Sequence, residues 1–370
     1  MPEWITTTLE ECTDILGDGL HGTPKYTENG EYAFVNGNNL VDGEILIKKE
    51  TKRVDYSQYD KYKKPLTNRT ILVSINGTLG NVGVYGSEKI ILGKSACYFN
   101  VKESVDKDFI YYIVSSPTFK QYLESNATGT TIKNISLKQM REYTFDLPEI
   151  GEQKRISSVL RKIDEKIKNN RAINNNLEQQ TQAIFDSMFP NISNGENTIG
   201  DTITPKRGKG LLSKNAVFGN VPVVAGGLEP STYHNTANTK APVLSISASG
   251  ANAGFVSLWN IPIWSSDSSF IDSSMTDDVY FWYVLLKKRQ REIYDSQTGS
   301  AQPHIYPQHI AAMPISDLNF DDVRNYTSIV TPIFEMIGHN KDENARLATT
   351  RDTLLPKLMS GELDVSDIDL

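Results

Sequence analysis

Five histidines and two cysteines are the side chains of this 370-residue chain best suited to bind a metal or to act as a nucleophile or base. A structural or catalytic zinc site needs such residues at short, regular spacings along the chain. No His-x-x-x-His or Cys-x-x-Cys spacing occurs, so we predict no metal site. The residues concerned are His21, His234, His304, His309, His339, Cys12 and Cys97.

Two glycine-containing segments resemble parts of phosphate-binding loops but lack the rest of the motif. Gly93-Lys94-Ser95 matches the end of a P-loop, which requires a glycine where this chain has Glu88. Gly208-Lys209-Gly210 has too few glycines for a nucleotide fingerprint. No Gly-x-Ser-x-Gly elbow is present either. Because no catalytic constellation emerges, the sequence favours a binding protein over an enzyme.

Clusters of basic residues are the positive chemical signal. Lys48 to Arg69 contains eight Lys and Arg, three acids, and the interleaved Tyr56, Tyr59 and Tyr62. A second group comprises Lys206, Arg207, Lys209 and Lys214, and a third comprises Lys287, Lys288, Arg289 and Arg291. A single cluster is most simply a solvated surface, but clusters in both halves of the chain favour DNA, whose phosphates need cations held on a surface.

The chain repeats itself at an offset of 170 residues. Ala127 to Leu160 recurs without a gap at Gln297 to Val330, and the match continues through the segments that follow. Farther upstream we align Ser74 with Ser245 and Gly83 with Gly254. The period far exceeds that of solenoid repeats, so it indicates two copies of one domain-plus-helix unit on a pseudo-two-fold frame.

Each copy is predicted to have a β-rich part, spanning residues 1–148 and 191–318. Short β-like runs at 70–75, 89–92, 241–247 and 261–264 are separated by Gly, Asn and Pro. A late aromatic helix is expected over Asp108–Leu123 and again over Asp278–Ile293. The first copy holds about twenty extra residues, mostly around Val41 to Arg69.

Two long helices are predicted over residues 149–190 and 319–361, followed by an acidic tail over 362–370. Both carry a heptad seam that is apolar at its ends and holds two asparagines in its middle: Asn170 and Asn174, then Asn340 and Asn344. Polar seam residues cost stability but fix register and partner. Pro332 either kinks the second helix or marks a later start.

An antiparallel intramolecular coiled coil follows from two such helices in one chain. About 38 helical residues span roughly 55 Å, which is about one and a half turns of B-DNA. The pair would then hold two globular blocks over separated half-sites. The alternative is that the helices are packing elements without a measuring role.

Composition limits the classes of protein to consider. The net charge of −7 argues weakly against a sequence-independent nucleic-acid coat. Two cysteines without ligand spacing fit a reducing compartment. The N-terminal residues lack the pattern of a signal peptide, and no apolar run has the length of a membrane helix. We therefore expect a soluble, cytoplasmic protein with no membrane contact.

Several segments resemble type I restriction-modification specificity (S) subunits. Gly129-Thr130-Thr131-Ile132-Lys133-Asn134-Ile135 and Leu147-Pro148-Glu149-Ile150-Gly151-Glu152-Gln153-Lys154-Arg155-Ile156 are similar to the end of a target recognition domain and the helix that follows. His21 to Tyr26 resembles the common N-terminal segment of that family, and Leu354 to Leu363 resembles the close of its second helix. The resemblance covers essentially the whole chain. The second copy departs from it, with Asp322-Val323-Arg324 in place of Glu-Gln-Lys.

This resemblance implies an α+β fold with two mixed α/β target recognition domains and a coiled coil between them. Each domain would read one half of a split, asymmetric target in double-stranded DNA, and the coiled coil would set the spacer. Two methyltransferase subunits and translocating restriction subunits would be the protein partners. S-adenosylmethionine, ATP and Mg would bind those partners, and this chain would bind no cofactor and catalyse no reaction.

The DNA contacts are nominated from the basic clusters, because the reading loops of this family differ. Arg207→Ala is expected to weaken DNA binding and its salt dependence. Lys133-Asn134 and Gln302–His304 occupy equivalent loops, which are either contacts or structural junctions. The nominated residues are Lys25, Lys52, Arg53, Lys63, Arg69 and Lys133 in the first copy and Lys206, Arg207, Lys209 and Lys214 in the second.

Three other hypotheses about the function remain open at this point. One is a specificity protein that works with a borrowed methyltransferase, or that acts only in methylation. Another is a coiled-coil scaffold whose two β-rich domains bind proteins. The third is an enzyme that acts alone.

Overall fold

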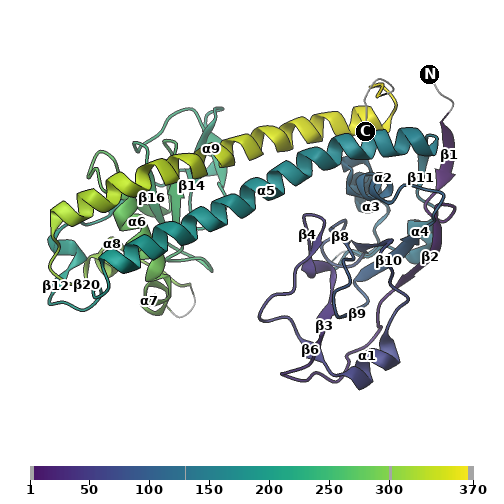
Figure 1. The fold of residues 1–370 in the computed structure, drawn as a ribbon, viewed down its shortest axis with the longest axis horizontal. Coiled ribbons are helices and arrows are strands. Elements are labelled where there is room, and N and C mark those ends of the chain that lie inside the picture. The colour runs from purple at the N-terminus through teal and green to yellow at the C-terminus, as the bar shows by residue number, and fades with distance from the viewer. Residues whose placement is uncertain (1–3, 130, 300–301, 366–370) are drawn as a thin grey trace. The chain divides into compact units, whose positions relative to one another are not determined.

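The computed structural model describes residues 4–129, 131–299 and 302–365. Thr130 of the family-like segment and residues 366–370 of the predicted tail lie outside these ranges. The chain forms two compact units, Met1–Lys166 with Arg346–Leu370, and Ile167–Ala345. Both cuts fall inside the long helices. The structural units therefore differ from the predicted sequence blocks, because each unit combines one globular domain with a stretch of both helices (Figure 1).

The first domain is built from short strands with helices near its end. Its elements in chain order are β1 (Ile5–Thr8), β2 (Thr13–Asp18), β3 (Tyr32–Val35), β4 (Leu40–Val41), β5 (Glu44–Ile45), β6 (Arg53–Val54), α1 (Tyr56–Tyr62), β7 (Thr70–Ser74), β8 (Val82–Val84), β9 (Ile90–Leu92), β10 (Ala96–Val101), α2 (Lys107–Ser115), α3 (Pro117–Asn126), α4 (Leu137–Arg141) and β11 (Thr144–Leu147).

Among the residues that the structure describes, the second domain lacks counterparts of β4, β5 and α1 but has the other corresponding elements. They are β12 (Asn197–Thr198), β13 (Lys206–Arg207), β14 (Val221–Val224), β15 (Thr232–His234), β16 (Val243–Ser247), β17 (Val256–Trp259), β18 (Trp264–Ser265), β19 (Ser268–Asp272), α6 (Val279–Lys288), α7 (Gln290–Asp295), α8 (Pro307–Ala311) and β20 (Pro314–Ile315).

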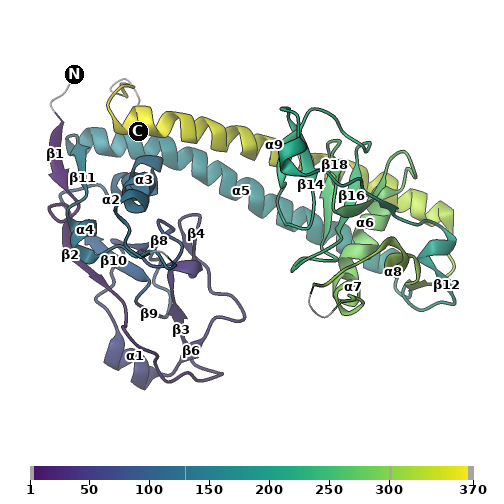
Figure 2. The ribbon, with the colours of Figure 1, turned by 180° about the vertical axis from the view of Figure 1, so that it is seen from behind.

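The sheets of the two domains have the same topology, apart from the additional pair β4-β5 in the first domain. Figures 1 and 2 label strands of both domains, among them β8 and β10 of the first and β14 and β16 of the second. The four-stranded sheets run β2-β10-β7-β8 and β13-β19-β16-β17. The three-stranded sheets run β6-β3-β9 and β15-β14-β18, each with one parallel pair, β3 with β9 and β14 with β18. A two-stranded pair, β1-β11 or β12-β20, completes each domain. The duplication read from the sequence is therefore a duplication of the whole domain fold.

Strand register corrects the sequence alignment in the central sheets. Ala96 pairs with Ser74 in the first domain and Ser268 pairs with Ser247 in the second. Gly80 donates its amide to the Ser74 carbonyl, as Gly254 does to Ser247. Ser74 is thus equivalent to Ser247 and Gly80 to Gly254, and the predicted matches of Ser74 with Ser245 and of Gly83 with Gly254 are wrong. A two-residue shift keeps every side chain on its own face of a strand, so the polarity pattern could not detect it.

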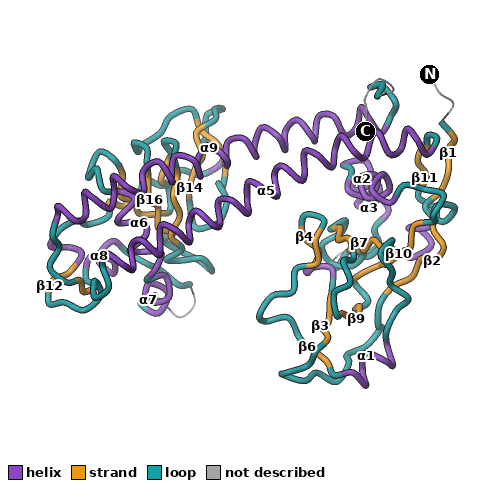
Figure 3. Tube along the Cα trace, viewed as in Figure 1, coloured by secondary structure: helices purple, strands orange, loops and turns teal. Residues whose placement is uncertain are grey.

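The late aromatic helix of each copy is two helices, which the sequence analysis did not separate (Figure 3). In the first copy α2 ends at Ser115 and α3 begins at Pro117. Ser116 caps α3 by accepting a hydrogen bond from the Phe119 amide at 3.1 Å. Proline suits the first turn of a helix, so Pro117 and the Ser116 cap together mark the start of a new helix. The predicted strand at 261–264 is also wrong, since only Trp264 and Ser265 form β18.

The two long helices are α5 (Ile150–Met188) and α9 (Phe320–Met359). Helix α9 runs through Pro332 without interruption, so the late start considered for it is wrong. Within each unit the helices are antiparallel, as the contacts Asn170–Asn344 and Asn174–Asn340 in one unit and Asp164–Arg351 in the other require. None of the twenty predicted seam positions is exposed, which confirms the heptad pattern.

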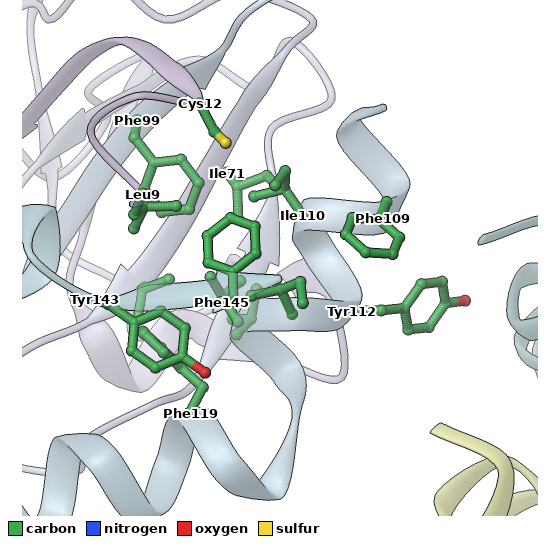
Figure 4. Packing of buried hydrophobic residues seen from close by; sticks show 14 of the residues in the cluster. Leu9, Cys12, Ile71, Phe99, Phe109, Ile110, Tyr112, Phe119, Tyr143 and Phe145 are labelled. Carbon is green, nitrogen blue, oxygen red and sulfur yellow. The ribbon is translucent and has the colours of Figure 1, made fainter. Parts of the chain in front are cut away.

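Each domain completes its hydrophobic core with side chains from both helices. The core of the first unit contains Ile156 and Leu160 from α5 and Leu355 and Leu358 from α9. Figure 4 shows how Phe109, Phe119, Tyr143 and Phe145 gather in this core. In the second unit Phe185 of α5 and Tyr326 of α9 pack edge to face at 5.4 Å and meet Phe281 of α6. The helices are therefore part of both cores.

The asparagines predicted to lie in the middle of each seam face one another across the helix pair. Asn170 Nδ2 donates to Asn344 Oδ1 at 2.9 Å, and Asn340 Nδ2 donates to Asn174 Oδ1 at 2.8 Å. Since Asn170 and Asn340 are equivalent in the repeat, the two bonds are related by its pseudo-two-fold symmetry. Asn170 also donates to Glu343 at 2.6 Å. A shift of one helix by a heptad would break both of these amide pairs.

A charged cluster joins the helices to the domain in the first unit. Arg351 donates to Asp164 Oδ1 at 2.8 Å, and Tyr112 on α2 donates to Asp164 Oδ2 at 2.7 Å. Burial, together with this hydrogen bond to a carboxylate, raises the pKa of Tyr112, so the phenol remains a donor at neutral pH. Asp164 therefore connects α5, α9 and α2.

We predict that the Asp164–Arg351 contact stabilises the first unit by about 1 kcal/mol, since both side chains are only partly exposed. The measurement is a double-mutant cycle of Asp164→Ala and Arg351→Ala, read from the hydrogen-exchange protection of α2 in the intact chain. The same cycle on the more exposed Lys63–Asp60 pair is the control and should give less. A coupling of zero for Asp164 and Arg351 would refute the prediction.

Replacing all four seam asparagines by leucine should raise the thermal midpoint of the chain and loosen helix register or partner choice, because buried amides exchange stability for specificity. Differential scanning calorimetry reports the first effect, and engineered cysteine cross-links at neighbouring seam positions report the second. A drop in the midpoint with unchanged register would show that the amides serve another contact.

Candidate nucleic-acid interface

Four nominated residues of the first domain lie on neighbouring segments. Arg53 is on β6, Lys52 precedes it, and Lys63 follows α1. The amide of Lys25 donates to Gln58 Oε1 of α1 at 3.0 Å, and the amide of Thr27 donates to the Arg53 carbonyl at 2.9 Å. These bonds bring together three segments, namely the loop that precedes β3, strand β6 and helix α1. The structure thus assembles Lys25, Lys52, Arg53 and Lys63 in one region.

The tyrosines interleaved with these cations form a cluster of their own. Tyr32 and Tyr59 stack at 4.0 Å between ring centroids, and Tyr56 lies within 6.3 Å of both rings. Lys63 pairs with Asp60 at 2.7 Å, and this carboxylate raises the pKa of the Lys63 ammonium. The tyrosines therefore support α1 against β3, while Tyr56 keeps an exposed edge.

Arg69 serves the fold of the first domain. Its guanidinium donates to the carbonyls of Val101, Lys102 and Val105 at 2.6–2.7 Å and lies 3.5 Å from Glu103. Those bonds close the loop between β10 and α2. A guanidinium held by three backbone carbonyls has little capacity left for a phosphate. Its position in the basic cluster of the sequence carried no sign of this role.

The loops that contain Lys133 and His304 are matching structural junctions. Asn134 forms backbone bridges with Thr128 and Asn76, and His304 does so with Thr298 and Ser249. The turns use Gly129 at φ 91° and Gly299 at φ 92°, a region that favours glycine. For the backbone of both loops, these contacts favour a structural junction over a DNA contact. The Lys133 side chain remains exposed.

The nominated residues of the second domain lie on β13 and the loop that follows it. Arg207 pairs with Asp267 at 2.6 Å, which offsets part of its charge. Lys209 is held through its backbone, since its amide donates to the Ser265 carbonyl and its carbonyl accepts from Trp264 Nε1 at 2.8 Å. Lys206 and Lys214 are exposed. All four belong to one continuous stretch.

Strand register aligns Lys25 of the first copy with Lys214 of the second. Asp18 and Arg207 lie opposite Cys97 and Ser269, which are equivalent in the sheets. Val35 and Val224 end the parallel pairs β3-β9 and β14-β18. The chain between these anchors has the same length in both copies, so the lysines align without a gap.

Sequence reasoning missed this equivalence because the offset here exceeds 170, owing to the segment with β4, β5 and α1. Gly19 and Gly208 could have revealed it. A Cβ on either glycine would lie within 2.5 Å of backbone on the neighbouring strand, so both must be glycine.

The aligned stretches differ sharply in charge. Lys206 to Asn220 contains four Lys and Arg and no acid. The equivalent Gly17 to Glu31 contains Asp18, Glu28 and Glu31 against a single lysine. The same backbone scaffold is therefore strongly basic in the second domain, whereas the cations of the first domain come mainly from the segment Lys48–Arg69.

The part of the chain that the structure describes gives little support for metal binding, thiol chemistry or a membrane span. No group of three or more His, Cys, Asp or Glu residues there could hold a metal ion. Cys12 and Cys97 are both buried, and burial raises the pKa of each thiol. Among the described residues, no helix is long and apolar enough to span a bilayer.

Comparisons with known proteins agree on one family. Residues 1–179 match the family model described as "Type I restriction modification DNA specificity domain". A type I specificity subunit from Mycoplasma genitalium is 23% identical over 376 residues, covering 96% of this chain and 93% of the relative. A type I restriction enzyme specificity subunit from Methanocaldococcus jannaschii is 24% identical over 389 residues, covering 94% of this chain and 87% of the relative.

A solved structure shares the fold over the whole chain. The crystal structure of the type I restriction-modification S subunit from M. genitalium aligns with a TM-score of 0.60 and 23% identity, covering 97% of this chain and 96% of that chain.

We predict that Lys25→Ala and Lys214→Ala each lower DNA affinity and reduce the slope of log affinity against log salt by about one, as expected for one phosphate contact. Titrations of labelled duplex at several salt concentrations measure both quantities. Lys138→Ala on α4, an exposed lysine whose ammonium pairs with Glu142 and which belongs to neither loop, is the matched control. An unchanged slope for both variants would remove this pair from the interface.

Proposed function

Because the chain belongs to the family of type I restriction-modification specificity subunits, we propose that it is the DNA-recognition subunit of such a system. Each globular domain reads one half of a bipartite, asymmetric sequence in double-stranded DNA. The observation that carries this proposal is the duplicated domain topology with unlike basic surfaces. Two copies of one fold with different surface chemistry suit a target whose two halves differ in sequence.

The helices α5 and α9 set the number of unread bases between the half-sites. Their 39 and 40 residues correspond to rods of roughly 60 Å at 1.5 Å per residue. The paired asparagines support this role, because helices that set a fixed DNA spacing must pair in a single register. The packing-only alternative would not require such polar pairs in the seam.

Methyltransferase subunits dock on the helix pair. In the second unit Ile173, Ile329 and Met336 lie on α5 and α9 with 44%, 41% and 52% of their surface exposed. Exposed apolar side chains on long helices are suited to a protein contact. We place S-adenosylmethionine, ATP and Mg on the methyltransferase and restriction partners, and assign no catalytic step to this chain.

Two further functions compete with this proposal. An orphan specificity subunit, acting only in methylation, would have the same structure. A coiled-coil scaffold with two protein-binding domains would not need the basic stretch Lys206–Asn220. Salt-sensitive retention of the purified chain on DNA distinguishes the scaffold from both specificity subunits.

The test is a methylome. The gene is expressed with its neighbouring methyltransferase gene in a host free of DNA methylation, and modified bases are mapped by single-molecule sequencing. We expect methyladenine on both strands of one split motif. A soluble complex that adds no methylation would refute the proposal. Adding the restriction gene then separates the orphan subunit from a complete system, because only the latter cuts unmodified DNA.

A further inference from the structure

The loop between β13 and β14 exposes large apolar side chains among its lysines. Phe218 is 96% exposed, and Leu212, Val217 and Tyr233 of the adjoining β15 are each more than half exposed. Exposing these groups together forgoes hydrophobic free energy that burial would provide. A concentrated apolar patch bordered by polar residues marks an interaction site.

The structure holds this loop in place by specific hydrogen bonds. The Leu211 amide donates to Ser266 Oγ at 2.9 Å, and the Val217 amide donates to His234 Nδ1 at 3.0 Å. His234 is buried and packs edge to face on Trp264 at 5.0 Å between ring centroids. Phe218 therefore projects from a fixed backbone, with its neighbour Gly219 against the His234 carbonyl.

A cavity of about 580 Å³ lies beside Phe218 and Tyr233. Its lining combines these two aromatic residues with Ala216 and with the polar residues Ser213, Asn220 and Thr232. A mainly apolar site with a few hydrogen-bonding groups recognises a ligand that has both characters. The edge of an A·T base pair has both, because the thymine 5-methyl group lies beside a carbonyl acceptor and an amino donor.

The first domain shows that the aromatic pair is not needed for the fold. In the aligned stretches Asn29 stands where the second domain has Phe218, and Arg53 stands where it has Tyr233. Both domains build the same sheets around these positions. The aromatic side chains therefore belong to the surface chemistry of the second domain, as Asn29 and Arg53 belong to that of the first.

Charge decides which partner fits the cavity. The stretch that carries Phe218 has four cations and no acid, in a chain with a net charge of −7. A polyanion is attracted to such a stretch, and an apolar cavity beside the cations can then contact the bases between the phosphates. This complementarity selects DNA over a protein partner.

We propose that Phe218 and Tyr233 determine specificity at one A·T pair of the second half-site, by enclosing the thymine 5-methyl group in this cavity. The inference rests on the proposed function and adds to it the residues and the base edge concerned. The first domain, with Asn29 and Arg53 at these positions, reads its half-site with polar groups.

The experiment uses the complex of this chain with its methyltransferase. The DNA is a set of duplexes that contain the motif identified by the methylome. Each thymine of the second half-site is replaced in turn by deoxyuridine, which lacks only the 5-methyl group. We expect one position at which the wild-type complex loses about fourfold in affinity, the value for one buried methyl group. Phe218→Ala should bind both duplexes equally, and Phe218→Leu should keep part of the difference.

Ile261→Ala is the matched control, since Ile261 is an exposed apolar residue of the same domain outside the cavity lining. It should retain the full fourfold difference. In cells, Phe218→Ala should relax the methylated motif at one position of the second half-site and leave the first half-site unchanged. Phe218 is almost fully exposed, so its variants are expected to fold, which circular dichroism verifies.

Several outcomes would overturn the inference while leaving the proposed function intact. They are a second half-site without an A·T pair, no deoxyuridine effect at any position, or an effect that persists in Phe218→Ala. Normal DNA binding by Phe218→Ala, together with failed assembly on the methyltransferase, would identify the patch as a protein contact. The absence of any sequence-specific methylation by the wild-type complex would instead refute the proposed function itself.

Discussion

Burial of the apolar helix seam within the cores of the globular domains is the constraint on which the rest of this structure depends. Two layers of asparagine in the seam cost the helix pair stability that the domain cores can supply. Here Ile156 and Leu358 complete the first core, and Phe185 and Tyr326 complete the second. Each domain therefore cannot fold fully without both helices, and each stretch of the helix pair gains its stability from one domain.

The two copies solve the same packing problem with different chemistry. Asp164, Arg351 and Tyr112 form a hydrogen-bonded cluster where α2 meets the helices. By the repeat offset, the equivalents of Asp164 and Arg351 are Phe334 and Thr181, and there Tyr280 stacks on Phe334 at 4.7 Å. The charged junction is held by directional hydrogen bonds, whereas the aromatic one is held by ring stacking. The backbone frame tolerates both because the seam positions on either side remain apolar.

The same division between frame and surface runs through the candidate DNA interface. Glycines 19 and 208 hold the loops against the sheets, and the junction turns at Gly129 and Gly299 repeat one backbone geometry. Lysine is retained at 25 and 214, while Asn29 and Phe218 differ in every property relevant to base recognition. Under the proposed function, such a scaffold would let two domains of one fold recognise unlike half-sites without changes to their cores.

Sequence alone determined the features that depend on local periodicity. The heptad spacing predicted both long helices, their buried seam and the facing asparagines, since a helix repeats its environment at fixed intervals. The gapless repeat predicted the duplicated fold for a different reason, because two segments of similar sequence form the same structural unit.

Only the tertiary structure decided what depends on contacts between distant residues. It set the equivalence of Ser74 with Ser247, because strand pairing alone distinguishes registers two residues apart. It also held Arg69 on backbone carbonyls and aligned Lys25 with Lys214 across an insertion. These features arise where the chain folds back on itself, and no short stretch of sequence contains them.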